Sequence, residues 1–228
     1  MNFTEYVNTF EAPWRKIVKK YAQLNKRYLI GTEDAIFWYS ELSNTGLLAA
    51  ASWLSGYPCI SEINEQKLVY TEARGRPRRS PGFVDLFLYN DQNQGEWVEA
   101  KRTTTIVDAS EAMRGDMRIR GLQPAMREAL RSSRRSTRVA SDWEGRAVSM
   151  VYVPFVLSDD YYGAGRRIRR RDERARAMNE KLHYFANSAN GNVRFASYFC
   201  VDHLKSMDEN GYRPFGFSIV ASIIDYSV

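Results

Sequence analysis

The segment from Gly82 to Arg102, GFVDLFLYNDQNQGEWVEAKR, constrains the fold more than any other part of the chain. It predicts an apolar strand that carries Asp85, a turn-rich loop, and a second strand that carries Glu99 and Lys101. Side chains on a strand alternate between faces, so Glu99 and Lys101 should point to one side while Ala100 points to the other. If the two strands pair as a hairpin, Asp85 joins them. Two carboxylates and an amine on one surface can bind a hard cation and position water, which is equipment for metal-assisted hydrolysis.

Asp85 is an unusual residue for the strand in which it lies. Residues 83–89 are apolar on both faces apart from this one acid, a pattern typical of an interior strand. Charged side chains are rarely buried without a partner, so the position calls for an explanation. A catalytic or metal-binding role is one interpretation. The alternative is an ordinary cross-strand ion pair among Asp85, Glu99 and Lys101, which is common in sheets.

A helix is predicted over residues 33–55, before the two strands. Thr32 can cap it, and Glu33 and Asp34 fall in the first turn, where acids are favourable. The run LLAAASWL is apolar nearly all round, which predicts a buried helix. Glu41 lies inside this apolar stretch, where a lone carboxylate is costly unless it is paired or bound to a metal. Glu41 is therefore a third candidate acid.

The remaining patterns predict an α/β protein. An amphipathic helix is expected over residues 3–28, with Pro13 near a break or a helix start, and a basic loop is expected over residues 73–82. Further strands are expected over 59–72, 147–157, 192–202 and 212–225, and further helices over 108–138, in two pieces, and 166–187. This order favours a central mixed β-sheet flanked by helices.

The motif residues resemble those of a known family. Asp85 in VDLFLY, followed by Glu99, Ala100 and Lys101 in WVEAKR and preceded by an acid-bearing helix, resembles the PD-(D/E)xK nuclease superfamily. That superfamily includes many type II restriction enzymes, archaeal Holliday-junction resolvases and lambda-type exonucleases. One departure is Val84, which stands where the motif has proline. The resemblance implies a restriction-endonuclease-like fold.

The resemblance also suggests how the chain is divided. It covers roughly residues 32–157, which is about the usual size of one domain. We therefore expect residues 1–228 to form a single nuclease-like domain. In this interpretation residues 1–31 are an N-terminal helical segment, and residues 158–228 are a C-terminal elaboration of helix and strands.

The resemblance implies a role for each candidate residue. Asp85 and Glu99 would hold one or two Mg²⁺ ions, for which Mn²⁺ could substitute, and the Ala100 carbonyl would complete the ligand shell. Lys101 would orient the attacking water or stabilise the charge that develops on the phosphate. Glu41 would bind a second metal ion or a water attached to it. The products would carry 5′-phosphate ends.

Positive charge is concentrated in two segments. Residues 114–138 hold eight arginines against two acids and residues 166–176 hold seven against two, so the rest of the chain is net acidic although the whole carries +6. Such clustering is the expected footprint of a polyphosphate partner, and arginine suits forked contacts to phosphate. Solvated helix faces are the alternative. The candidate nucleic-acid-binding residues are Arg131, Arg134, Arg135, Arg167, Arg170 and Arg171.

Composition excludes several other classes. Cys59 and Cys200 are the only cysteines, which supports neither a disulfide framework nor a zinc site and fits a reducing cytoplasm. His183 and His203 are too few for a histidine-rich metal centre. No apolar run reaches the length of about 18 residues that a membrane span needs, and the first residues lack the layout of a signal peptide.

The leading hypothesis is a cytoplasmic, metal-dependent nuclease that acts on DNA. A catalytically inactive module that binds nucleic acid or another protein on the same fold is the competing class, and RNA is an alternative substrate. No helicase motif or separate recognition domain is visible in the sequence, so we expect targeting to come from the basic helices, the C-terminal strands, or a partner protein or homo-oligomer.

Overall fold

The structure is a computed structural model that describes residues 3–32, 35–69, 78–90, 94–103, 105–106, 124–125, 127–129, 131–132, 145–158, 180, 193–200 and 212–226. Within these ranges the helices are α1 (Trp14–Thr32), the short 3₁₀ helix η1 (Ile36–Trp38) and α2 (Glu41–Leu54). The strands are β1 (Phe3–Asn8), β2 (Cys59–Val69), β3 (Arg78–Tyr89), β4 (Gly95–Arg102), β5 (Thr105–Ile106), β6 (Gly145–Ser158), β7 (Val193–Cys200) and β8 (Tyr212–Tyr226).

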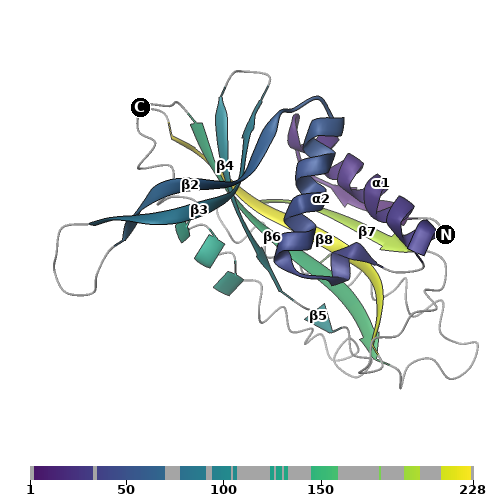
Figure 1. Ribbon diagram of the computed structural model, residues 1–228. Coiled ribbons are helices and arrows are strands. Elements are labelled where there is room, and N and C mark those ends of the chain that lie inside the picture. Colours follow the sequence, from purple (N-terminus) through teal and green to yellow (C-terminus); the bar gives the residue numbers. More distant parts are fainter. Residues whose placement is uncertain are drawn as a thin grey trace, which may run out of the picture.

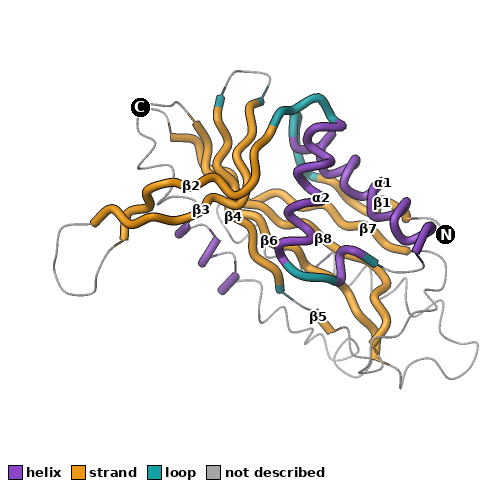
Figure 2. The backbone as a smooth tube through the Cα atoms, viewed as in Figure 1, coloured by secondary structure: helices purple, strands orange, loops and turns teal. Residues whose placement is uncertain are grey.

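The strands form one mixed sheet in the order β1-β7-β8-β6-β4-β3-β2, with β5 beside β6 (Figure 1). β4 and β5 run parallel to β6, while the other neighbours are antiparallel. β2 and β3 extend beyond the rest of the sheet as a two-stranded arm (Figure 2). The predicted α/β class with a central mixed sheet is confirmed.

Helices α1 and α2 lie side by side on one face of the sheet and enclose the main core (Figure 1). Alternate residues of the central strands turn toward these helices, as the period of a strand requires. Val98 and Ala100 of β4 and Met150 of β6 are examples, and all three are fully buried. A smaller apolar cluster forms from Val84, Phe87 and Trp97.

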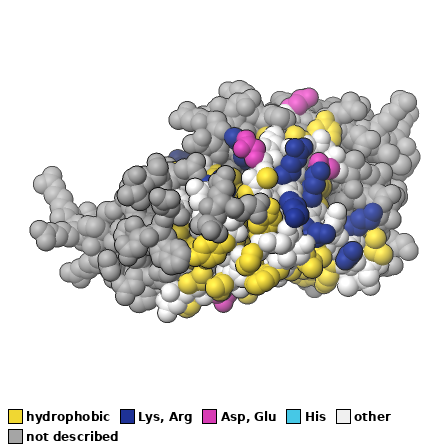
Figure 3. Space-filling model, turned by 90° about the horizontal axis from the view of Figure 1, so that it is seen from above, with side chains coloured by type: hydrophobic (Ala, Val, Ile, Leu, Met, Phe, Trp, Pro, Cys, Tyr) yellow, Lys and Arg dark blue, Asp and Glu magenta, His cyan; other side chains and the backbone are white. Residues whose placement is uncertain are grey.

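The helix α1 is amphipathic, as predicted, but it begins later than expected. Its buried residues recur at helical spacing: Trp14, Ile17, Val18, Tyr21, Ala22, Asn25 and Leu29. Its outward face carries Arg15, Lys16, Lys19, Lys20, Lys26 and Arg27, and Figure 3 shows basic side chains gathered over this helix. The expected helix over residues 3–28 is wrong for residues 3–8, which form β1. That segment pairs antiparallel with β7, its paired residues lying 188 to 197 positions apart in the sequence, and local periodicity does not reveal such a partner.

The single helix expected over residues 33–55 is confirmed only over Glu41–Leu54. The chain forms η1 and then α2, and α2 is capped by Ser40, whose hydroxyl accepts a hydrogen bond from the Ser43 N–H at 3.2 Å. Thr32 ends α1 instead of capping the next helix, and residues 33 and 34 lie outside the described residues. Nor is α2 buried all round: Leu42, Trp53 and Leu54 are exposed, because only one face meets α1 and the sheet.

The remaining strand predictions are confirmed as β2, β6, β7 and β8. Part of the predicted basic loop is in fact strand, since residues 78–82 belong to β3, while residues 70–77 lie outside the described ranges. The described residues between 124 and 132 and residue 180 are helical; the rest of the predicted helices over 108–138 and 166–187 is not described. No helix in the described ranges is both long and apolar enough to cross a membrane.

Candidate functional site

Asp85 lies where the β3–β4 ladder ends. The last pair of the ladder is Leu86 with Val98. Beyond it, the Asp85 carboxylate accepts a hydrogen bond from the backbone of β4. The Ala100 N–H donates to Asp85 Oδ2 at 2.7 Å. A hydrogen bond of this length to an ionised oxygen is among the stronger ones in proteins, and it fixes the carboxylate beside the Ala100 peptide. Asp85 is partly buried, so the side chain keeps access to solvent.

The strand on the other side of β3 is also irregular at this level. Ser61 pairs with Leu86 and Ile63 with Val84, which places Glu62 opposite Asp85. Glu62 has φ of 53°, in the left-handed region that residues other than glycine rarely adopt. The backbone on both sides of Asp85 therefore departs from regular pairing at one level of the sheet. Strained backbone of this kind clusters at functional sites.

Glu41 reaches the same region from the helix side. It is the first residue of α2, where the helix dipole favours an acid, and its Oε1 lies 3.2 Å from Lys101 Nζ. The Lys101 side chain is 24% exposed and that of Glu41 is 36% exposed, so the pair lies at the edge of the core. The expectation that Glu41 sits inside an apolar helix is wrong, because α2 begins at this residue. Its carboxylate has a cationic partner in Lys101.

Lys101 is held in its charged form. Burial by itself lowers the pKa of a lysine, but the attraction of Glu41, followed by Asp85 and Glu99, outweighs it and raises the pKa of Lys101 above its ordinary value of 10.5. Three carboxylates thus act electrostatically on one ammonium group, and Glu41 is the one in direct contact with it.

A cleft of about 700 Å³ opens on these residues. It is lined by Phe83, Asp85, Glu99, Lys101, Pro124, Arg127, Glu128, Arg131 and Ser132. The structure therefore brings Asp85, Glu99, Lys101 and Arg131 together, and Glu41 joins them through Lys101. Ala100 turns its side chain into the core, as alternation predicts. The candidates Arg134, Arg135, Arg167, Arg170 and Arg171 lie outside the described residues.

The acids of the cleft fit a hydrated hard cation. Mg²⁺ takes oxygen ligands and keeps several waters, so two carboxylates and a backbone carbonyl suffice. Asp85 uses Oδ2 for the Ala100 N–H, which leaves Oδ1 for a cation. Among the described residues, no three His, Cys, Asp or Glu side chains come together as a metal-binding group. Glu41 is paired with Lys101, while Asp85 and Glu99, the two acids expected to bind the metal, both line the cleft.

A buried tyrosine near the cleft was not predicted from the sequence. Tyr152 of β6 is 2% exposed and stacks on Tyr21 of α1, with 6.0 Å between ring centroids. Burial raises the pKa of Tyr152 well above its ordinary value, and the nearby Tyr21, Asp85 and Glu41 add to the effect. The phenol is therefore neutral and can only donate or accept a hydrogen bond. A tyrosine in an apolar strand carries no sequence signal of such a position.

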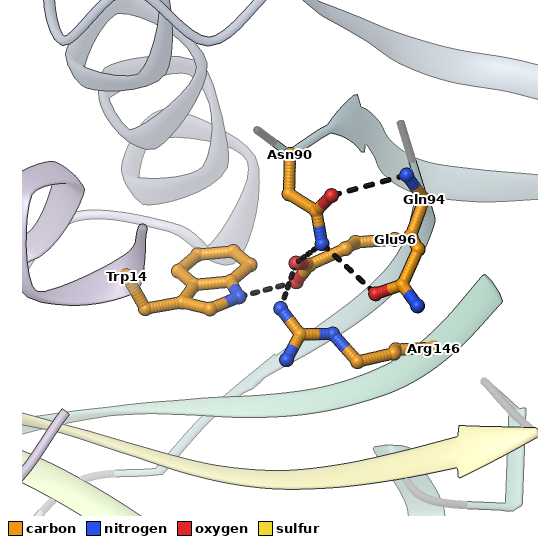
Figure 4. A network of polar contacts seen from close by, with 5 residues as sticks. All are labelled: Trp14, Asn90, Gln94, Glu96 and Arg146. Carbon is orange, nitrogen blue, oxygen red and sulfur yellow. Dashed lines mark hydrogen bonds and ion pairs between the residues drawn. The ribbon is translucent and has the colours of Figure 1, made fainter. Parts of the chain in front are cut away.

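A second polar network lies at the other end of β4 (Figure 4). Glu96 is fully buried and accepts hydrogen bonds from the Trp14 indole, from Arg146 and from Asn90 Nδ2, the last at 3.1 Å. Asn90 in turn accepts from the Gln94 N–H at 3.0 Å and closes the β3–β4 loop. The network ties α1 to β4 and β6. Glu96 lies three residues before Glu99 in β4, and an acid in this buried strand was a possible signal of the network.

No protein-family model matches this chain, and neither do any curated proteins or solved structures. The fold and the cleft define the class of protein: an α/β protein with a mixed sheet and a cleft, lined by acids, a lysine and arginines, where β3 and β4 cease to pair.

Proposed function

We propose that the chain is a metal-dependent nuclease of the PD-(D/E)xK type that hydrolyses phosphodiester bonds in DNA and leaves 5′-phosphate ends. One observation carries the proposal: Asp85, Glu99 and Lys101 line one cleft together with Arg127 and Arg131. Phosphodiester hydrolysis needs three components: acids that bind a metal cation, an ammonium group, and arginines that bind phosphate. A restriction-endonuclease-like core and a cytoplasmic place of action belong to the same proposal.

Asp85 and Glu99 would hold the Mg²⁺ ion, with the Ala100 carbonyl as a further ligand. When bound, the metal supplies charge stabilisation at the phosphate and lowers the pKa of water. The Ala100 N–H, by its hydrogen bond to Asp85, keeps that carboxylate oriented, and such supporting contacts strengthen ligand sets generally. Mn²⁺ would substitute because it accepts the same oxygen ligands.

Lys101 would act as a charged group and not as a base. Its raised pKa keeps the amine protonated throughout neutral pH, so it has no lone pair with which to take a proton from water. It would instead donate hydrogen bonds to the attacking water or to a phosphate oxygen on which charge develops. Glu41 would hold the Lys101 side chain in place through the ion pair at 3.2 Å.

Arg127 and Arg131 would grip the substrate backbone. Both side chains are exposed and line the cleft. They come from the described helical residues between 124 and 132, whereas Asp85 and Glu99 come from β3 and β4. Their positive charge offsets the repulsion between a phosphate and the carboxylates of Asp85 and Glu99. Arg134 and Arg135, which follow in sequence, would extend this contact, and Arg167, Arg170 and Arg171 would supply a second one.

One observation favours a second candidate function. Glu41 and Lys101 satisfy each other, so part of the site is an ion pair that would persist without any metal. The same cleft would then be a nucleic-acid-binding module without catalysis. An RNA substrate is a further alternative within the nuclease hypothesis.

A cleavage assay separates these possibilities. The protein is incubated with plasmid, linear duplex, single-stranded DNA and RNA in the presence of Mg²⁺, Mn²⁺ or EDTA. We expect cleavage with either metal and none with EDTA. Asp85→Asn and Glu99→Gln should reduce the rate about a hundredfold or more and weaken metal binding, whereas Lys101→Met should reduce the rate as much but leave metal binding intact.

The matched control is Glu11→Gln, an exposed carboxylate outside the cleft, which should cut at the wild-type rate. Nucleic-acid binding without cleavage under any of these conditions would favour the binding module. Wild-type rates in all three cleft variants would place the chemistry elsewhere.

A further inference from the structure

Phe83 is an exposed aromatic side chain inside a polar cleft. It lies on β3 two residues before Asp85 and lines the same cleft. Its side chain is 61% exposed, although the neighbouring Val84 and Leu86 are fully buried. It belongs to neither the main core nor the small cluster of Val84, Phe87 and Trp97. An apolar ring exposed to water in a cleft lined by three acids, a lysine and two arginines contributes little to folding, so its position points to a ligand.

The spacing between Phe83 and Asp85 suits a nucleotide. Residues two apart on a strand lie on the same side and about 7 Å from each other. A phosphate bound in the cleft near Asp85 would therefore have a neighbouring base within reach of the Phe83 ring. Aromatic side chains stack on bases of any sequence, because every base has a π-face. Arg127 and Arg131 of the cleft would bind the phosphate backbone of the same nucleic acid.

We propose that Phe83 stacks on an unpaired base next to the phosphate held in the cleft, so that the site prefers single-stranded or locally unpaired DNA to a continuous duplex. Within a duplex, each base face is covered by its neighbours, and a side chain can reach it only after unstacking, which costs a few kcal/mol. The inference rests on the proposed function for the position of the phosphate. It adds the form of the substrate and the residue that selects it.

Binding without cleavage tests the inference. A fluorescent single-stranded oligonucleotide and the same sequence as a blunt duplex are titrated with the full chain in EDTA. For the wild type we expect tighter binding of the single strand. Phe83→Ala and Phe83→Leu should weaken that binding about tenfold and leave the duplex affinity unchanged, while Phe83→Trp should retain or improve it. The base analogue 2-aminopurine, placed along the single strand, should be quenched by the wild type and not by Phe83→Leu.

Ile60→Ala is the matched control. Ile60 is 62% exposed on the neighbouring strand β2 and does not line the cleft, so its loss should change neither affinity. Equal binding of the single strand by wild type and Phe83→Leu would overturn the inference, as would an equal loss for single strand and duplex. Thermal unfolding of each variant excludes misfolding, since removing an exposed ring should not lower Tm. If the wild type stacks the probe but cuts nothing with Mg²⁺, the nuclease proposal fails and the stacking site stands.

Discussion

Removal of the Arg146 charge should destabilise the protein strongly. Glu96 is fully buried, and Arg146, whose side chain is 18% exposed, is the cationic partner that the structure gives it. Arg146→Met keeps much of the side-chain volume but leaves a buried carboxylate with the neutral donors Trp14 and Asn90. Breaking a buried ion pair from one side typically costs about 3–5 kcal/mol. We expect a value near the lower end, about 3 kcal/mol, because two hydrogen bonds to Glu96 remain.

Urea unfolding followed by circular dichroism measures this loss. With a typical slope of about 2 kcal/mol per molar urea, 3 kcal/mol corresponds to a midpoint lowered by about 1.5 M. Glu96→Gln in the Arg146→Met background should restore part of the stability, because a neutral amide costs less to bury than an unpaired carboxylate. Glu11→Gln, which breaks the exposed pair with Arg194, is the control and should barely move the midpoint. A loss below about 1 kcal/mol for Arg146→Met, or a double variant less stable than the single one, would refute the reasoning.

Two further predictions concern the cleft. Glu41→Gln should lower the pKa of Lys101, because Glu41 is the largest of the charges that raise it; the titration is followed by NMR of the lysine side chain, and an unchanged pKa would contradict the assigned ion pair. Because the folded-state pKa of Lys101 is raised, its charge stabilises the wild-type fold up to the ordinary lysine value of 10.5, and that contribution is lost as the pH rises through the folded-state pKa. Arg131→Gln should reduce the magnitude of the log–log salt dependence of DNA binding by about one unit, with a similar loss of affinity for every sequence. DNA affinity is measured in EDTA by titration at several salt concentrations. A log–log slope equal to that of the wild type would show that Arg131 contacts no phosphate.

Local pattern predicted the central hairpin. The apolar run around Asp85, the turn-rich loop after it and the alternation of Glu99, Ala100 and Lys101 are properties of neighbouring residues, and strand geometry converts them directly into faces. The strands β6, β7 and β8 were predictable for the same reason. Helix α1 was predictable over most of its length, because its buried residues recur every three or four positions.

Long-range pairing decided what local pattern could not. The segment 3–8 became an edge strand because β7 offers it a ladder, and β8 inserted between β7 and β6 although it is the last strand in the sequence. The N-terminus of α2 depends on the cap at Ser40, which competed with an equally acceptable cap residue at Thr32. Periodicity contains no information about which distant backbone will satisfy a strand's hydrogen bonds.

The candidate site divides in the same way. The amino-acid sequence by itself determined that Glu99 and Lys101 share a face of one strand, since the period of two suffices, and it predicted that Asp85 joins them if the two strands pair. Only the tertiary structure decided that Glu41 meets Lys101 across 60 residues of chain, that Arg131 and Phe83 line the same cleft, and that Glu96 is neutralised by Arg146. A buried or half-buried charge needs a partner, but which residue provides it depends on how helices and strands return to one another in space.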